Sequence, residues 1–267
     1  MSVARSKEAP RLRDALLPFA VLAGALLAWE ALVRISAIPP YVLPAPSLVA
    51  ETLAKDREVL FSALLVTLTT ALEALALATI GGVALALLIS RSRWMERALM
   101  PFAIVLQVTP IIAIAPLLLV YLAPAEAVLV CAFLVAFFPI LANTSLGLAS
   151  VDRALVELFD LYRASPWQKL VYLRAPAALP QFFAGLRIGG GLALIGAIAA
   201  ELAAGAAGQG AGLAFRISEA GYRLDIPRMF AALALVSLAG VVIYAALTAL
   251  SRLALGRWHE SARGLEE

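Results

Sequence analysis

Long apolar runs recur along this chain, and each is long enough to cross a lipid bilayer. About 20 helical residues, rising 1.5 Å each, span the hydrocarbon core of about 30 Å. Inside that core every backbone N–H and C=O needs a partner, and a helix supplies those partners within one segment. With 63% hydrophobic and 15% charged residues, the composition excludes an ordinary soluble protein. The sequence therefore predicts an all-α, polytopic membrane protein.

We predict about six transmembrane helices in a membrane domain that covers residues 15–256. A cytosolic arm (1–14) precedes it and a cytosolic tail (257–267) follows it. The predicted spans are residues 15–33, 60–89, 98–122, 126–148, 181–204 and 229–253. Because no small-residue cleavage pattern follows the first span, we interpret it as a retained anchor.

Prolines predict two irregular regions. Pro101, Pro110 and Pro116 interrupt the third span, which should be kinked and locally unwound. The connector over residues 35–60 holds four prolines and should contain a short surface helix opened by Ser47. This connector is predicted to lie outside the cytosol.

Basic residues indicate which side is cytosolic, because positively charged segments resist translocation. Most of them fall before the first span, after the second, between the fourth and fifth, and after the sixth. Both termini and the loop over residues 150–180 are therefore predicted to face the cytosol. The net charge of +3 is small and spread between apolar runs, so nucleic-acid binding is not expected.

The cytosolic loop contains an amphipathic segment. Leu155, Leu158, Phe159 and Tyr162 recur at helical spacing and share one face of a short helix. Ser165-Pro166-Trp167-Gln168 then predicts a second helix with a capping box. A plain connector does not need aromatic residues exposed to the cytosol, whereas a partner surface does. We therefore predict a helix–turn–helix that binds a soluble partner.

From Glu157 to Pro176 this segment resembles the EAA loop of ATP-binding cassette (ABC) importer permeases. Further runs are similar to the subgroup that imports nitrate, taurine, sulfonates and pyrimidine precursors. These runs are Ser165–Gln168, Pro176–Pro180, Phe183–Arg187, Gly196–Glu201, Phe138–Thr144 and Arg257–Glu260, so the resemblance covers nearly the whole chain after Leu60. Arg163 stands where the loop usually has glycine and Ala175 where it has leucine, and we expect a changed angle between the two short helices.

The resemblance implies a bundle of the type I ABC importer permease kind in the bacterial inner membrane. Its partners would be an ABC ATPase subunit dimer, an external substrate-binding protein and a second permease bundle, either a homodimer partner or a relative. The chain has no G-x-x-x-x-G-K-[ST] motif, so ATP is expected on the ATPase and no cofactor on this chain, which is not an enzyme. The predicted ATPase-coupling residues are Glu157, Leu158, Phe159, Asp160, Tyr162, Arg163, Ala164, Ser165 and Pro176.

Polar residues inside spans are expensive to bury, so each is a candidate for the translocation pathway. The candidates are Glu73, Gln107, Thr109, Asn143, Thr144, Arg187 and Glu201. Hydrogen bonding between helices is the alternative for Gln107, Thr109 and the Asn143–Ser145 cluster. Glu73 is either a gate or a buried structural acid, Arg187 can snorkel to the interface, and Glu201 could mark the outer mouth.

Glycine and charge patterns leave further alternatives open. Gly185, Gly189, Gly190 and Gly191 permit either close helix packing or a hinge. The Gly205–Gly212 segment predicts a mobile external loop. The charged residues after it suit either a binding-protein contact or a solvated helix; they are Arg216, Glu219, Arg223 and Asp225.

Two other functions compete with import by an ABC permease. An ion-gradient transporter could use Glu73 and Glu201, but such proteins generally carry an internal repeat, and none is found here. A membrane enzyme would need a convergent acid, base or metal cluster, yet the one histidine, His259, lies in the tail. Arg187 is the one basic residue inside a span, so charge does not choose between sulfonate, taurine, nitrate and pyrimidine-like solutes.

Overall fold

In the computed structural model, which describes residues 12–205 and 211–256, every regular element is a helix. The all-α prediction is therefore confirmed for the described chain. The elements are α1 (Leu12–Ile35), α2 (Pro46–Lys55), α3 (Arg57–Ser90), α4 (Arg93–Val108), α5 (Ile111–Tyr121), α6 (Pro124–Ala149), α7 (Arg153–Leu161), α8 (Pro166–Lys169), the π-helical turn η1 (Leu170–Arg174), α9 (Ala175–Ala204), α10 (Leu213–Tyr222) and α11 (Ile226–Leu255).

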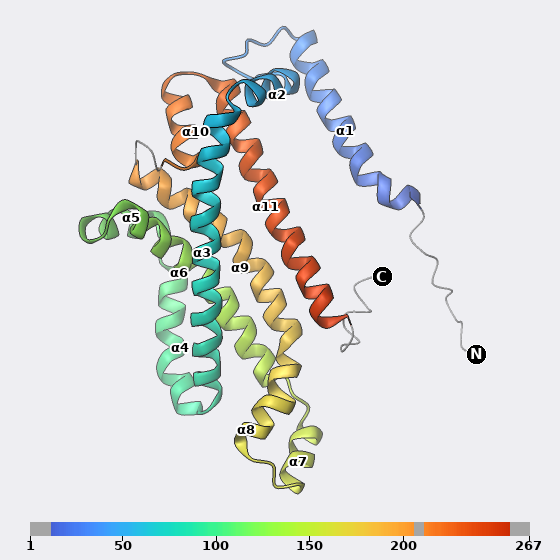
Figure 1. Cartoon of the computed structure of the whole chain (residues 1–267), viewed down its shortest axis with the longest axis vertical. Coiled ribbons are helices and arrows are strands. Elements are labelled where there is room, and N and C mark those ends of the chain that lie inside the picture. Colours follow the sequence, from blue (N-terminus) through green and yellow to red (C-terminus); the bar gives the residue numbers. More distant parts are fainter. Residues whose placement is uncertain (1–11, 206–210, 257–267) are drawn as a thin grey trace.

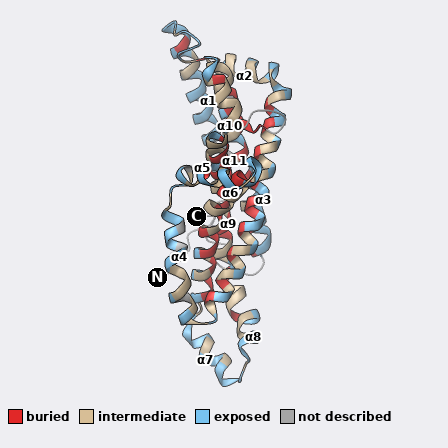
Figure 2. Ribbon diagram, turned by 90° about the vertical axis from the view of Figure 1, so that its left-hand side faces the viewer, coloured by how far each residue is buried: buried red, intermediate tan, exposed pale blue. Residues whose placement is uncertain are grey.

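Helices α3, α6 and α9 form the centre of the bundle, and α11 packs beside them (Figure 1). The buried residues follow these helices along the long axis, whereas α7 is mostly exposed (Figure 2). Many of the buried residues are alanine, including Ala71, Ala132 and Ala197. Lipid tails are as apolar as leucine, so helices associate in a membrane through close packing, which small residues permit.

Glycines bring α6 and α9 into close contact. A Cβ on Gly185 would lie 2.8 Å from the Pro139 carbonyl oxygen and 2.8 Å from the Asn143 Cβ. A Cβ on Gly147 of α6 would lie 2.8 Å from the Ala178 Cα of α9. At Gly191, by contrast, an added Cβ would meet nothing within 4 Å. Close packing is thus the observed role of Gly185, one of the two roles that the sequence allowed.

Five helices of the described chain are long and apolar enough to cross a membrane. They are Leu16–Ile35, Arg57–Ser90, Pro124–Ala149, Pro166–Ala204 and Ile226–Leu255. The predicted third span, 98–122, is instead divided into α4 and α5, which run in different directions in Figure 1. Pro110 causes the break, because it has no N–H to donate and it disfavours helical geometry at Thr109. Pro101 and Pro116 lie within continuous helices.

The N-terminal helix α1 stands apart from the bundle, and only 6% of its apolar window is buried (Figure 1). It is tied to α2 by Glu30, whose carboxylate accepts hydrogen bonds from the Ser47 amide (3.0 Å) and the Ser47 hydroxyl (2.7 Å). The prediction that Ser47 opens the connector helix was wrong. Helix α2 begins at Pro46 with Ala45 as its N-cap, and Ser47 holds α1 instead.

The bundle has two distinct ends. Helices α7 and α8 lie at one end, and α2 and α10 lie at the other (Figure 1). The Leu12 end of α1 and the Leu255 end of α11 both point toward the α7–α8 end. Helix α3 runs from the α2 end of the molecule toward the α7–α8 end (Figure 1).

Replacing Gly185 with alanine should destabilise the bundle, because the new Cβ meets the backbone of α6. Overpacking of this kind typically costs about 1–3 kcal/mol. Gly191→Ala is the matched control on the same helix and should be neutral or slightly stabilising, since alanine favours a helix over glycine by about 1 kcal/mol. The stability of both variants would be measured as the midpoint of thermal unfolding in a neutral detergent. Equal midpoints for the two variants would contradict the close contact at Gly185.

Candidate functional site

Helix α7 presents an exposed apolar surface at one end of the molecule. The Asp152 side chain caps the helix by accepting a hydrogen bond from the Ala154 amide at 2.9 Å. No residue of α7 is buried. The large exposed apolar side chains of α7 are Leu155, Leu158 and Leu161, and Tyr162, directly after the helix, is exposed as well. Leu161 and Tyr162 are each 78% exposed. This surface has no partner among the described residues, and we call it the α7 surface.

The turn after α7 is left-handed at Arg163, where φ is +53°. The Ala164 amide donates to the Phe159 carbonyl and the Arg163 amide donates to the Asp160 carbonyl, each at 2.9 Å. These two bonds make a Schellman motif, in which the left-handed position is usually glycine. The structure therefore places Arg163 in the conformation that glycine would adopt most easily. The changed angle between the two short helices stays a prediction.

The second short helix begins as predicted. The Ser165 hydroxyl accepts from the Gln168 amide at 3.2 Å, and the Gln168 side chain accepts from the Ser165 amide at 2.7 Å. An ion pair between Asp160 and Lys169 joins α7 to α8. The Glu157 side chain is exposed and makes no hydrogen bond or ion pair with any residue that the structure describes. Pro176 lies half-buried in the first turn of α9.

A cavity of about 500 Å³ lies beside the break between α4 and α5. Gln107, Thr109 and Pro110 contribute to its wall, and side chains of α6 and α9 complete it. The Thr109 hydroxyl donates its proton to the Val105 carbonyl at 2.7 Å. In this arrangement the hydroxyl can accept a hydrogen bond from the cavity but does not donate one to it. The structure thus brings two predicted pathway residues, Gln107 and Thr109, to one apolar cavity.

The other predicted pathway residues do not line this cavity. Asn143 donates from its side chain to the Pro139 carbonyl at 2.8 Å and packs against α9. Thr144 is buried, and its hydroxyl has no hydrogen-bond partner in the described chain. Arg187 is half-buried on α9, and Glu73 is exposed on α3.

Glu201 is buried at the end of α9, with 8% of its surface exposed. The Thr67 hydroxyl donates to its two carboxylate oxygens at 2.8 and 3.1 Å. The Ala214 amide donates to the same carboxylate at 3.1 Å, and the Leu213 amide donates to the Thr67 hydroxyl at 2.9 Å. Glu201 therefore caps α10 from a different helix.

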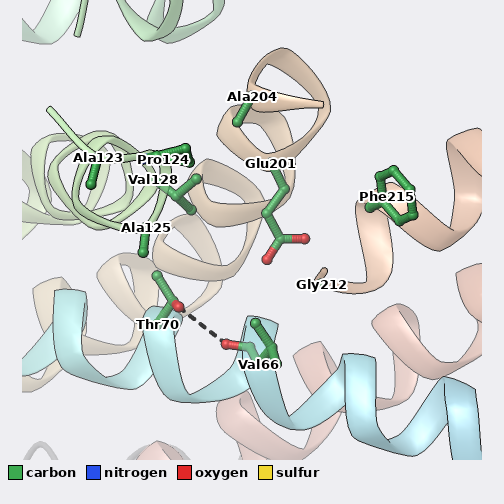
Figure 3. A pocket seen from close by; sticks show the side chains of 10 residues that line it. All are labelled: Val66, Thr70, Ala123, Pro124, Ala125, Val128, Glu201, Ala204, Gly212 and Phe215. Atoms are coloured by element: carbon green, nitrogen blue, oxygen red, sulfur yellow. Dashed lines mark hydrogen bonds between the residues drawn. The ribbon is translucent and has the colours of Figure 1, made fainter. Parts of the chain in front are cut away.

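Gly212 allows this arrangement, because a Cβ at that position would lie 2.2 Å from each Glu201 carboxylate oxygen. Figure 3 shows the Glu201 carboxylate directed toward Gly212. The same side chain contributes to the wall of a cavity of about 310 Å³, together with Thr70, Val128 and Phe215.

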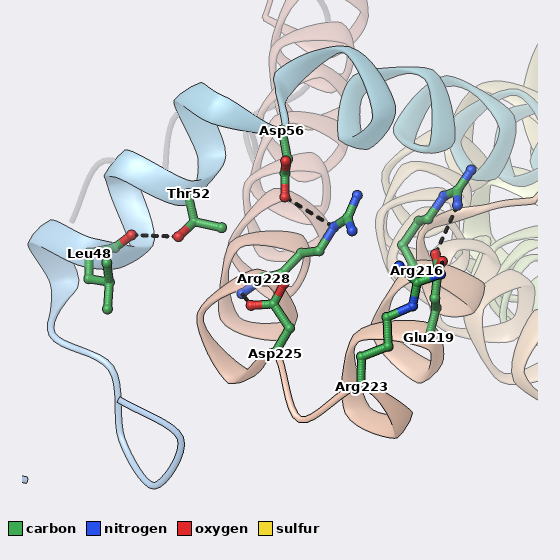
Figure 4. Close-up of polar contacts among 8 residues, drawn as sticks. All are labelled: Leu48, Thr52, Asp56, Arg216, Glu219, Arg223, Asp225 and Arg228. Atoms are coloured by element: carbon green, nitrogen blue, oxygen red, sulfur yellow. Dashed lines mark hydrogen bonds and ion pairs between the residues drawn. The ribbon is translucent and has the colours of Figure 1, made fainter. Parts of the chain in front are cut away.

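The charged residues after the glycine-rich loop pair with one another and with Asp56 (Figure 4). Glu219 accepts from Arg216 at 2.9 Å and from Arg223 at 2.8 Å. Arg228 pairs with Asp56 at 3.1 Å, and Asp225 caps α11 by accepting from the Arg228 amide at 3.3 Å. Of the glycine-rich loop itself, residues 206–210 lie outside the described chain.

The hydrogen bond from Arg216 holds the pKa of the Glu219 carboxyl below its ordinary value. Partial burial opposes this shift, and the charges of Arg223 and Arg228 reinforce it. The two ion pairs of Glu219 lie within α10 and its C-cap, whereas the Arg228–Asp56 pair joins the start of α11 to the start of α3.

Comparison with known proteins identifies the family. The family model described as "Binding-protein-dependent transport system inner membrane component" matches residues 78–255, which is more than half of the chain. The chain belongs to this family. The match includes the α7–α8 segment, the cavity beside Pro110 and Glu201. The permease is accordingly a multi-pass membrane protein of a transport system.

Individual relatives agree with the family match. The permease is 37% identical to a riboflavin transport system permease protein from Chloroflexus aurantiacus, over 88% of this chain and 87% of that protein. It is 33% identical to a formylaminopyrimidine transport permease protein from Halalkalibacterium halodurans, over 86% of this chain and 91% of that protein. It is 28% identical to a taurine transport system permease protein from Escherichia coli, over 94% of this chain and 92% of that protein. These relatives confirm an ABC importer permease of the predicted subgroup.

Thr67 and Gly212 are the residues of the permease that the sequence analysis missed. Thr67 lies 134 residues from Glu201 along the chain, and Gly212 was interpreted as part of a mobile loop. No local spacing links these positions. The one available signal was Glu201 itself, since a carboxylate in an apolar run demands a hydrogen-bonding partner.

Replacing Thr67 with valine should loosen α10, because Glu201 and the Leu213 amide each lose a buried partner. An unsatisfied buried polar group costs about 1–3 kcal/mol. Hydrogen exchange of the α10 amides should therefore become about tenfold faster or more. Thr69→Val is the matched control, since the Thr69 hydroxyl bonds only to carbonyls of its own helix. Unchanged exchange in Thr67→Val would show that Glu201 does not hold α10.

The Glu219 contacts should make stability depend on pH. Because the folded-state pKa of Glu219 lies below its unfolded value of about 4.3, ionised Glu219 stabilises the permease above that pH. This contribution is lost as the pH falls through the folded-state pKa. The difference in melting temperature between wild type and Glu219→Gln should shrink from pH 7 toward pH 3. Arg216→Gln should remove much of the same dependence, and a constant difference would refute the assignment.

Proposed function

We propose that this permease is the membrane-spanning subunit of an ATP-driven, binding-protein-dependent importer of a small solute. The α7 surface is the observation that carries the proposal. It is apolar, exposed and held rigidly by a cap, a Schellman turn and an ion pair to α8. A surface of this kind fits a groove on a soluble partner, and aromatic residues such as Tyr162 are typical of interfaces.

The partner that we propose for the α7 surface is a dimer of separate ATPase subunits, which bind the ATP. This assignment rests on the resemblance of residues 157–176 to the EAA loop. The permease itself would bind no nucleotide and no other cofactor. The proposed coupling residues are Glu157, Leu158, Phe159, Asp160, Tyr162, Arg163, Ala164, Ser165 and Pro176. An external substrate-binding protein would contact the opposite end, where α10 lies (Figure 1).

The α7–α8 end is proposed to lie in the cytosol. Arg91 and Arg174 lie close to this end, and basic residues favour the cytosolic side. The N-terminal end of α1 and the C-terminal end of α11 both point toward this end, which supports cytosolic termini (Figure 1). We accordingly propose the domain boundaries of the sequence analysis, with residues 1–14 and 257–267 in the cytosol.

The working unit is proposed to contain a second permease bundle, and a homodimer is the simplest form. Glu73 is exposed in the middle of α3, beside the exposed side chains of Leu72, Leu77 and Ile80. A carboxylate facing lipid at this depth is costly, so a protein surface is expected to cover it.

The translocation pathway is proposed to include the cavity beside Pro110. None of the residues that line it in the described chain is charged, and Gln107 and Thr109 supply an amide and a hydroxyl. An uncharged lining favours a neutral ring solute over a small anion, because an anion would lose its hydration without compensation. A pyrimidine-like substrate is therefore favoured over taurine, a sulfonate or nitrate.

Charged residues on the α7 surface should uncouple the permease from its ATPase. The double variant Leu161→Asp and Tyr162→Asp removes two side chains that are each 78% exposed, so folding should be preserved. The ATPase should no longer co-purify with this variant, and substrate-stimulated ATP hydrolysis in proteoliposomes should fall about a hundredfold, as expected when interface hot spots are lost. Tyr222→Asp is the matched control for co-purification of the ATPase, because Tyr222 is 91% exposed at the end opposite to the α7 surface.

Two outcomes would contradict the proposed function. Uptake that persists in the double variant with unchanged ATP hydrolysis would show that the α7 surface is not the coupling surface. Uptake by the purified permease alone, driven by an ion gradient, would favour the secondary-transporter alternative.

A further inference from the structure

A third cavity, of about 530 Å³, lies at the α7–α8 end of the molecule, separate from the α7 surface. It is bounded by the last residues of α3 on one side and by α8 and η1 on the other. We call it the basic pocket, and its polar and aromatic lining consists of Ser90, Arg91, Trp167, Lys169 and Arg174. No acidic residue lines it in the described chain.

The positive charge of the basic pocket is only partly compensated. Lys169 pairs with Asp160. Arg174 donates to the Ser90 carbonyl at 3.5 Å, and Arg91 is exposed. Neither arginine forms an ion pair with any side chain that the structure describes. Two guanidinium groups in one cavity therefore favour an anion that accepts several hydrogen bonds.

The backbone of the pocket wall is irregular where Arg174 enters it. The turn over Leu170–Arg174 is π-helical, and the Ala175 amide donates to the Leu170 carbonyl five residues earlier. A π-turn places one extra residue in a helical turn and so rotates the side chains around it, and such turns are frequent at functional sites. Here the turn lies between α8 and α9 and brings Arg174 to the end of α3.

We infer that the basic pocket binds the phosphate group of an anionic membrane lipid. Its wall includes Ser90, the last residue of a helix long and apolar enough to span the membrane, so the pocket lies toward one side of the bilayer. Trp167 is 70% exposed there, and tryptophan is enriched at this level of the bilayer. Basic pockets between helices on the cytoplasmic side suit anionic headgroups. The inference rests on the proposed orientation, with the α7–α8 end in the cytosol, and it does not depend on the proposed ATPase partner or substrate.

The test uses the full chain in a neutral detergent, with Trp29, Trp94 and Trp258 replaced by phenylalanine so that Trp167 alone reports. Short-chain phosphatidylglycerol should produce a saturable change in fluorescence, and phosphatidylcholine of the same chain length should not. Arg91→Ala and Arg174→Ala should each raise the dissociation constant about fivefold, as expected for one basic residue. Arg252→Ala is the matched control, an exposed arginine in the last turn of α11, and should leave the constant unchanged.

Other outcomes would overturn the inference. If phosphatidylcholine changed the Trp167 fluorescence equally, or if Arg252→Ala weakened phosphatidylglycerol binding as much as the pocket variants do, the lipid would be attracted to the protein surface in general and not to the basic pocket. Inorganic phosphate that binds as tightly as phosphatidylglycerol would assign the pocket to a free anion instead of a lipid. Loss of the lipid response when the ATPase is added would assign the pocket to the ATPase contact. If Arg174→Ala does not fold, Arg91→Ala decides the result, since Arg91 is exposed at a helix end.

Discussion

Close packing between α6 and α9 is the interaction on which the other parts of this permease depend. In lipid there is no hydrophobic gain from joining two apolar helices, so their association relies on contacts made at short distance. Gly147 and Gly185 provide that distance, because neither position has room for a Cβ. Once α9 is fixed in this way, its two ends are fixed as well. One end continues through η1 into α8, and the other end carries Glu201.

Helix α9 therefore joins two functional regions that lie about 45 Å apart along a straight helix of 30 residues. At one end, the Asp160–Lys169 ion pair attaches α7 to the short helix that leads into α9. At the other end, Glu201 and Thr67 attach α10 to α9 and α3. A force applied to the α7 surface can thus reach α10 through one continuous element, provided that α9 moves as a rigid body. This geometry is consistent with the proposal that energy enters at the α7–α8 end.

The structure separates the predicted pathway residues into those beside a cavity, those bonded within the chain, and the exposed Glu73. Gln107 and Thr109 lie where Pro110 interrupts a helix, and an interruption of this kind is tolerated at membrane depth only when it lines a cavity or is covered by protein. Glu201 and Asn143 have hydrogen-bond partners within the chain and act in packing and capping. Glu73 has no such partner among the described residues and lies on an exposed part of α3.

The sequence by itself determined the features that follow from local rules. The helical class, the break at Pro110, the capping box at Ser165 and the special turn at Arg163 were all predictable, because each depends on residues within one or two helical turns. Only the tertiary structure decided that Glu201 is buried against Thr67 while Glu73 is exposed, and that Arg91 and Arg174 share a pocket. In water, the apolar stripe of a helix indicates which side is buried. In a membrane both sides of a helix are apolar, so the contacts between helices follow from shape and distance, which no local pattern records.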